Sequence, residues 1–373
     1  MPSYSELGIT PVINANATLT RLGGSLMPPE VVQAMADAAK VFIDLPELQR
    51  RVGNRIALLT QNEACYVSSG AAGGIVVAIA ACITGKNMAA IHQLPDLTGL
   101  KNEVIVHKSH RNGYDHAVRQ VGVKLVEIGY AGSTFDWQLE AALNENTAAV
   151  IWFQGNMTGR GDIPLARVIE IAHAQGVPVL VDGAAQLPPV ENLWKFTQMG
   201  ADAAIFSGGK DLRGPQSSGL VLGKQWLIDA CALNGSPNHS IGRPMKVGKE
   251  EMLGLLAAVE RYLALDHTGR LSQTEEIVSG WCNELNKLDG VSAHRSFPNE
   301  AGQPMPRAQV HFDASAVGRS RDEIVQGLLA NEPAVSVASG PDGSIYLNPM
   351  TLEDGEEETV LSRLVEEIQR ASG

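Results

Sequence analysis

The chain has 373 residues, of which 44% are hydrophobic, and it carries a formal net charge of −12 at pH 7. This length supports two or three domains with a substantial core, and the acidic balance argues against nucleic acid or an anionic membrane surface as the main partner. The longest apolar run, residues 75–83, is too short to cross a bilayer, and the first residues lack the basic and apolar segments of a signal peptide. We therefore expect a cytoplasmic protein with no membrane partner.

Alternating apolar and amphipathic segments predict strands that alternate with helices over the first two-thirds of the chain. After an irregular arm over residues 1–25, Pro28 and Pro29 open the first helix. The remaining elements predicted here are strands at 64–69, 104–107, 124–128, 148–153 and 177–181, and helices at 71–83, 137–144 and 164–175. Strands that are apolar along their whole length suit a mostly parallel sheet buried on both faces, so the predicted fold class is α/β.

A long helix over roughly 249–266 marks the expected domain boundary. Beyond it, the predicted helices are 273–287, 320–330 and 355–371, and the predicted strands are 306–312 and 344–348. We expect residues 1–248 to form the arm and a large domain, and residues 249–373 to form an interdomain helix and a smaller C-terminal α+β domain.

The four cysteines lack the spacing of metal ligands: Cys65, Cys82, Cys231 and Cys282. Because Cys65 and Cys82 lie in apolar runs, we expect buried thiols in a reducing compartment. The sequence predicts no metal site.

Small residues over 68–74, Ser-Ser-Gly-Ala-Ala-Gly-Gly, follow a predicted strand and open a helix. They allow the backbone to approach an anion, and the new helix offers free N–H groups and the positive end of its dipole. This turn suits a phosphate monoester, although turns of this composition also serve only to pack a strand closely against a helix.

Asp182 and Lys210 follow two later apolar strands and stand 28 positions apart (210 − 182). A carboxylate and a lysine at strand ends are the groups that hold pyridoxal phosphate: the lysine forms a Schiff base, and the aspartate pairs with the pyridine nitrogen. Ser207 could donate its hydroxyl to the cofactor phosphate, and Arg213 is a nearby cation that would lower the pKa of the lysine. Taken singly, each residue also fits an ordinary turn or helix cap, and only their order and spacing favour the cofactor.

With these motifs, the chain resembles the fold type I pyridoxal-phosphate enzymes, the aspartate aminotransferase superfamily. Within that superfamily it is most similar to the branch that joins bacterial selenocysteine synthase and the D-glucosaminate-6-phosphate ammonia-lyases. The resemblance covers nearly the whole chain and is most specific over residues 207–219 and 241–251. It implies an aspartate aminotransferase-like fold, with the cofactor bound by the large domain.

The resemblance also implies roles for individual residues. Lys210 would be the Schiff-base and catalytic residue, and Asp182 the pyridinium partner. The cofactor phosphate would lie at Ser69, Gly70 and Ala71.

A histidine would stack on the cofactor ring, and His110 matches that place, with His107 as its competitor. The chain departs from related enzymes at Gln186, which stands four residues after the aspartate rather than three.

Arg243 and Arg307 are the candidates for binding a substrate carboxylate, because arginine binds carboxylates with two parallel hydrogen bonds. Arg21 and Lys246 are further cations near family-like motifs, and a phosphorylated substrate would need several such cations together. For each of them, a solvated or structural role is an open alternative.

The expected reaction is the deamination of a hydroxy-amino acid, such as a sugar amino acid or its phosphate. Lys210 would remove the Cα proton and then assist the departure of a β-hydroxyl, and the product would hydrolyse to a 2-keto acid and ammonia. A racemase or an aminotransferase would share the first step and remains an alternative.

Two other functions are less favoured by the sequence. A seryl-tRNA selenium transferase would need a tRNA-binding module, and this acidic chain shows no basic extension. A non-catalytic scaffold is disfavoured by the presence of both Asp182 and Lys210. The expected partners are a small-molecule amino acid and further copies of the chain, since the family builds its sites at subunit interfaces in homodimers or larger homo-oligomers.

Overall fold

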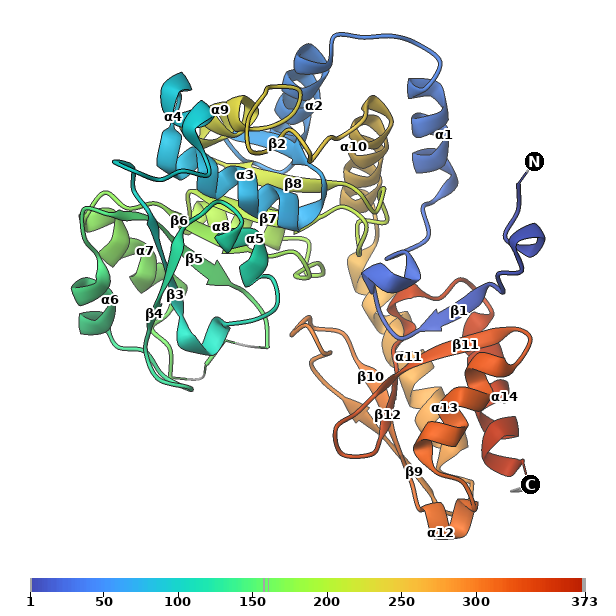
Figure 1. Cartoon of the computed structure of the whole chain (residues 1–373). Coiled ribbons are helices and arrows are strands. Elements are labelled where there is room, and N and C mark those ends of the chain that lie inside the picture. The colour runs from blue at the N-terminus through green and yellow to red at the C-terminus, as the bar shows by residue number, and fades with distance from the viewer. Residues whose placement is uncertain (1, 157, 160, 371–373) are drawn as a thin grey trace. The chain divides into compact units, whose positions relative to one another are not determined.

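The computed structural model describes residues 2–156, 158–159 and 161–370, which form two compact units (Figure 1). The larger unit is Met27–Leu265, and the smaller unit combines the residues up to Leu26 with those from Asp266 onward. These units differ from the expected domains at two places. The N-terminal segment joins the C-terminal residues, and the long helix after residue 248 belongs to the larger unit.

A seven-stranded sheet forms the centre of the larger unit. Its strands, in spatial order, are β2 (Ala64–Ser68), β8 (Gly219–Gly223), β7 (Ala203–Ser207), β6 (Val179–Asp182), β5 (Thr147–Phe153), β3 (Glu103–His107) and β4 (Lys124–Ile128). Every strand except β8 runs in the same direction, because β8 pairs in antiparallel fashion with both β2 and β7. The α/β class and the mostly parallel sheet are thereby confirmed.

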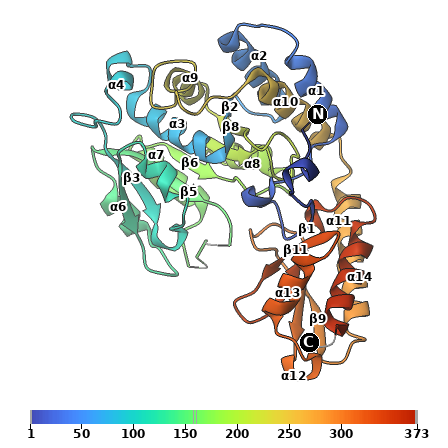
Figure 2. The same cartoon turned by 45° about the vertical axis from the view of Figure 1, so that its right-hand side comes forward.

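Helices cover both faces of this sheet (Figures 1 and 2). They are α1 (Pro29–Ala38), α2 (Leu45–Leu59), α3 (Gly70–Thr84), α4 (Met88–Gln93), α5 (Asp115–Arg119), α6 (Asp136–Ala142), α7 (Leu165–Ala174), α8 (Asn192–Gln198), α9 (Gln225–Asn234) and α10 (Lys249–Leu263), with a 3-10 turn η3 (Lys108–His110). Helix α3 is apolar around its whole circumference, as expected of a helix buried against a sheet, and α3 and α9 pack on the same face.

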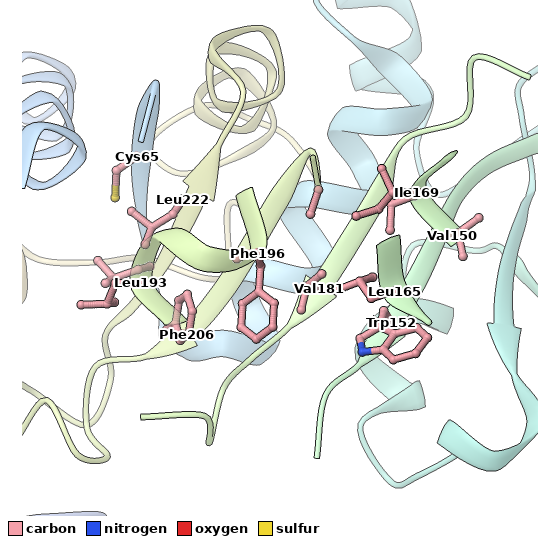
Figure 3. Close-up of a cluster of buried hydrophobic side chains, with 14 of the residues drawn as sticks. Cys65, Val150, Trp152, Leu165, Ile169, Val181, Leu193, Phe196, Phe206 and Leu222 are labelled. Atoms are coloured by element: carbon pink, nitrogen blue, oxygen red, sulfur yellow. The ribbon is translucent and has the colours of Figure 1, made fainter. Parts of the chain in front are cut away.

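The central strands contribute alternate side chains to two separate cores. On β5, Val150 and Trp152 face one core, while Ile151 and Phe153 face the other. Figure 3 shows Trp152 in the first of these cores, together with side chains of α7 and α8. This alternation on a strand buried on both faces explains why the sequence reads as one continuous apolar run.

The smaller unit contains a five-stranded sheet in the order β1 (Val12–Ala15), β11 (Ala334–Ser339), β12 (Ile345–Leu347), β10 (Arg307–Phe312) and β9 (Val291–Ser296). Its helices are α11 (His267–Leu285), α12 (Ala314–Val317), α13 (Arg321–Ala330) and α14 (Glu356–Gln369), with 3-10 turns η1 (Ser5–Leu7), η2 (Thr20–Leu22) and η4 (Pro349–Thr351). Strand β1 pairs in parallel with β11, so the expectation of an irregular arm over residues 1–25 was wrong for Val12–Ala15. Within the described residues, no helix has both the length and the apolar character needed to cross a membrane.

Candidate functional site

Several of the predicted site residues meet at one edge of the seven-stranded sheet. Because β2, β3, β6 and β7 run in the same direction, their last residues, Ser68, His107, Asp182 and Ser207, lie along the carboxyl edge. Strand β8 runs the opposite way, so its first residue, Gly219, pairs with both Ser68 and Ser207 at this edge. Carboxyl edges of this kind are where open α/β sheets bind ligands.

The first turn of α3 forms a cradle for an anion. Ser69 is the N-cap residue, yet its side chain accepts no capping hydrogen bond from the helix. A Cβ on Gly219 would lie 2.6 Å from the backbone carbon of Gly70 and 2.9 Å from the nitrogen of Ala71, so only glycine allows β8 to approach this turn so closely. The free N–H groups and the helix dipole make the turn suitable for a phosphate.

The predicted cations near this cradle come from the segment after α9. A Cβ on Gly73 would lie 3.8 Å from the sulfur of Met245, so the segment passes close to the start of α3. Arg243 and Lys246 flank Met245 and are exposed, and neither side chain forms an ion pair with another described residue. Both are therefore accessible to an anionic ligand of this unit.

Asp182 is a buried carboxylate whose charge is compensated in part by the predicted lysine. Burial raises its pKa, while the hydrogen bond from the Ala184 N–H (2.9 Å) and the charge of Lys210 act in the opposite direction. A group carrying a positive charge beside Asp182 would favour the ionised form of the carboxylate further. Asp182 and Lys210, separated by 28 positions in the chain, therefore interact in the fold.

Lys210 lies in the turn between β7 and β8. At two positions of this turn, the surrounding atoms leave no room for a side chain larger than that of glycine. A Cβ on Gly208 would clash with Ser218, and one on Gly209 would clash with the backbone of Gln216. The two glycines that precede the lysine are thus explained by the close return of the chain toward β8. The Ser207 hydroxyl at the start of this turn makes no hydrogen bond to another described residue.

The residue that follows the lysine anchors the turn to the larger unit's core. Asp211 is buried and accepts a hydrogen bond of 2.7 Å from the Tyr262 hydroxyl of α10. Arg213, which the sequence suggested as a local cation, adopts a left-handed backbone (φ 56°), and its N–H donates to the carbonyl of Lys210. The backbone that follows Lys210 is therefore held in place.

His107 and His110, which the sequence treated as competitors, form a stacked pair. Both side chains are fully buried, their ring centroids are 4.7 Å apart, and each packs edge-on against Trp152. Burial lowers the pKa of His107 to about 4 and that of His110 to about 4. None of the four ring nitrogens makes a hydrogen bond to a described residue, which is an unusual state for buried polar atoms.

Arg307 begins β10 in the smaller unit, whereas the predicted cofactor-binding residues and Arg243 belong to the larger unit. Its guanidinium is nearly buried, pairs with Glu300 at 2.9 Å and stacks over the ring of Tyr346. Its Nε makes no hydrogen bond to a described residue. These partners give Arg307 a structural role in the small sheet.

Sequence reasoning missed Asp162, Trp152 and Tyr262. Asp162 follows a segment rich in glycine and polar residues, and nothing in its local pattern separates it from an ordinary loop aspartate. Trp152 and Tyr262 read as core residues of a strand and a helix. Only the three-dimensional arrangement shows that these side chains contact the histidines and the lysine turn.

Comparisons with known proteins agree with this geometry. Residues 79–239 match the family model described as aminotransferase class-V. The chain is 32% identical to the D-glucosaminate-6-phosphate ammonia lyase of Salmonella typhimurium over 99% of the chain and 98% of that protein. A solved structure of a D-glucosaminate-6-phosphate ammonia-lyase superposes with a TM-score of 0.87 at 32% identity and covers 100% of both chains.

Relatives with other activities are also similar over most of the chain. A 5'-C-glycyluridine monooxygenase-decarboxylase of a Streptomyces species is 32% identical over 97% of the chain and 91% of that protein. An L-seryl-tRNA(Sec) selenium transferase of Solidesulfovibrio magneticus is 26% identical over 96% of the chain and 82% of that protein. Sequence identity alone therefore does not separate the reactions of these relatives.

Proposed function

Because the chain belongs to the fold type I family of pyridoxal-phosphate enzymes that includes the D-glucosaminate-6-phosphate ammonia lyases, we propose that it is a pyridoxal-phosphate-dependent ammonia lyase. Its proposed substrate is a hydroxy-amino acid, either a sugar amino acid or its phosphate. The observation that carries this proposal is that buried Asp182 ends β6 and the turn with Lys210 follows β7 at the same edge of the sheet, which also presents the first turn of α3.

The residues at this edge fit the cofactor. The first turn of α3 with Ser69, Gly70 and Ala71 suits its phosphate, and Ser207 ends β7, which is separated from β2 by β8 alone. The buried Asp182 suits a protonated ring nitrogen, and we propose that the stacked rings of His107 and His110, whose nitrogens make no hydrogen bond to a described residue, lie beside the cofactor ring. We propose that Lys210 binds the cofactor covalently.

The chemistry divides between the cofactor and the chain. When bound, pyridoxal phosphate supplies an electron-accepting ring that stabilises negative charge at the substrate Cα. Asp182 would keep the ring nitrogen protonated, and the free Nζ of Lys210 would take the Cα proton. Lys210 would then donate a proton to the departing β-hydroxyl, so that water leaves, and hydrolysis of the remainder would yield a 2-keto acid and ammonia.

The arginines are proposed to anchor the substrate. Arg243 is exposed in the larger unit and unpaired within the described residues, which supports a role in binding an anionic group. Arg307 is proposed as a further contact of the carboxylate, because arginine binds carboxylates with two parallel hydrogen bonds. We also propose that the enzyme works in the cytoplasm as a homodimer or a larger homo-oligomer.

The first test is cofactor binding by the purified protein. We expect the wild type to take up pyridoxal phosphate with a visible absorption band, and Lys210→Ala to lose the band together with about 10²–10⁴-fold in turnover. Lys224→Ala, which removes a surface lysine paired with Glu63, is the matched control and should behave as the wild type does. A wild type that stays colourless with added cofactor would contradict the proposal.

The second test separates the reactions. D- and L-hydroxy-amino acids, with and without phosphate, are incubated with the loaded enzyme, and ammonia, 2-keto acid, chirality and oxygen uptake are measured together. A lyase forms ammonia and keto acid in equal amounts without oxygen. Loss of chirality without ammonia would indicate a racemase, and oxygen uptake with release of carbon dioxide would favour the activity of the equally similar monooxygenase-decarboxylase.

A further inference from the structure

Asp162 joins three loops at the carboxyl edge of the large sheet. Its Oδ2 accepts hydrogen bonds from the Ser109 hydroxyl (2.6 Å) and the Gly159 N–H (2.7 Å), and its Oδ1 accepts one from the Thr134 hydroxyl (2.8 Å). Ser109 follows β3, Thr134 follows β4, and Gly159 follows β5. One carboxylate, with only 1% of its side chain exposed, therefore holds together the loops after three adjacent strands.

This carboxylate is ionised although it is buried. Burial alone would raise the pKa of Asp162, but the hydrogen bonds from Ser109, Thr134 and Gly159 outweigh burial, and the pKa lies below its ordinary value. A fixed negative charge is thus present beside the histidine pair at neutral pH. The nearest ring nitrogen, Nε2 of His110, lies 3.4 Å from Oδ2 in a contact that is not aligned as a hydrogen bond.

The charge determines which His110 nitrogen carries the proton. A neutral imidazole has one N–H and one lone pair. A lone pair on Nε2 would face the carboxylate oxygen at 3.4 Å and be repelled, whereas an N–H there would be attracted. The form with the proton on Nε2 is therefore favoured, and Nδ1 is left as an acceptor.

We propose that Asp162 is a positioning residue that fixes the ring of His110 with its proton on Nε2, and through it sets the geometry of the His107–His110 stack. The tautomer follows from the contacts of this chain alone, whereas its value for catalysis rests on the proposed function. A neutral ring of fixed orientation can stack on an electron-poor pyridinium ring. A protonated imidazole would be repelled by that cation.

The tautomer is measurable in the protein without cofactor. In protein labelled with ¹⁵N-histidine, we expect the wild-type His110 to show a protonated Nε2 and an unprotonated Nδ1 at pH 7, with His110→Gln used to assign the signals. In Asp162→Asn, which preserves size and removes the charge, the ratio of the two tautomers should fall by about tenfold or more. Asp136→Asn, which removes an exposed carboxylate paired with Arg167, should leave the ratio unchanged.

An unchanged His110 tautomer in folded Asp162→Asn would overturn the inference. If that variant does not fold, Ser109→Ala and Thr134→Val each remove one hydrogen bond to Asp162, and each should loosen the ring and move the ratio in the same direction. A ratio that stays at the wild-type value in both of these variants would equally overturn it.

Kinetics of the loaded enzyme test the consequence for catalysis. Asp162→Asn should lower kcat by about 10- to 100-fold with little change in KM, since it misplaces a group at the reacting centre and removes no substrate contact. A wild type that fixes the tautomer as described but releases no ammonia would refute the proposed function and leave the role of Asp162 intact. A wild-type kcat in Asp162→Asn with an altered tautomer would overturn the catalytic consequence.

Discussion

His107 and His110 are exposed to water only when the chain unfolds. Their protonation therefore makes the free energy of unfolding depend on pH. The unfolded chain binds their protons near pH 6.5, whereas the folded chain binds them near pH 4 because both rings are buried. The unfolded state thus holds more protons between these values. The free energy of unfolding should fall as the pH decreases from about 6.5 to about 4, by at most about 1.4 kcal/mol per pH unit for each histidine.

Chemical denaturation of the apo protein at pH 7 and pH 5 measures this effect. His107→Gln and His110→Gln should each flatten the dependence of unfolding free energy on pH, since each removes one of the two groups. His92→Gln replaces an exposed histidine of α4 and serves as the control. Equal pH slopes in all four proteins would contradict the prediction.

At the scale of elements, the close contact between β8 and α3 shapes the turn that we propose for the cofactor phosphate. Gly219→Ala places a methyl group 2.6 Å from the backbone of Gly70, so β8 and the first turn of α3 must separate. We expect a loss of about 1–3 kcal/mol in unfolding free energy and at least a tenfold weaker affinity for pyridoxal phosphate. Gly113→Ala, where the added Cβ meets nothing within 4 Å, is the matched control in thermal unfolding and cofactor titration.

The same contact shows which elements the sequence could predict. The apolar strands and the helix at 71–83 were predictable because their patterns are local, and the fold type followed from the motif around Lys210. Strand β8 was not predicted, because it is only a short apolar run after a glycine-rich turn. Such a run also gives no sign of the strand's antiparallel direction. The pairing of β1 with β11 was also missed, because these strands lie more than 300 positions apart and only tertiary packing brings them together.

The candidate site divides in the same way. Asp182 and Lys210 were proposed from their places after apolar strands, and their roles stay predictions, to which the structure adds that the charge of Lys210 acts to lower the pKa of Asp182. Asp162 was not predictable, because its function as an anchor depends on hydroxyl and N–H groups from three separate loops. Whether His107 or His110 stacks on the cofactor stays a prediction, and the structure adds that the two rings form one unit.

At the scale of the whole molecule, the chain exposes apolar side chains that a monomer would leave in water. Phe42 is fully exposed (103%) between the exposed Val41 and Ile43, in the segment that joins α1 and α2. Such patches mark interaction sites, and the proposed homo-oligomer would cover this one. Light scattering after size exclusion should give at least twice the chain mass for the wild type and a lower mass for Phe42→Asp.

Trp137→Asp provides the control for this experiment, because Trp137 is also exposed (60%) but lies on α6. It should leave the mass unchanged. A monomeric wild type, or an equal effect of both substitutions, would refute an oligomer built on the segment around Phe42.

The antiparallel direction of β8 has a consequence for the timing of the proposed reaction. Ser207 of β7 pairs directly with Gly219 of β8. The two ends of the loop that carries Lys210 are therefore one strand spacing apart. With both loop ends joined, the backbone beneath the lysine is held in place. Repositioning of the lysine side chain between its proposed roles would then need only bond rotations, which take picoseconds to nanoseconds, whereas enzymes of this kind turn over in milliseconds to seconds. Bond breaking or product release, rather than the movement of the lysine, should therefore limit the rate.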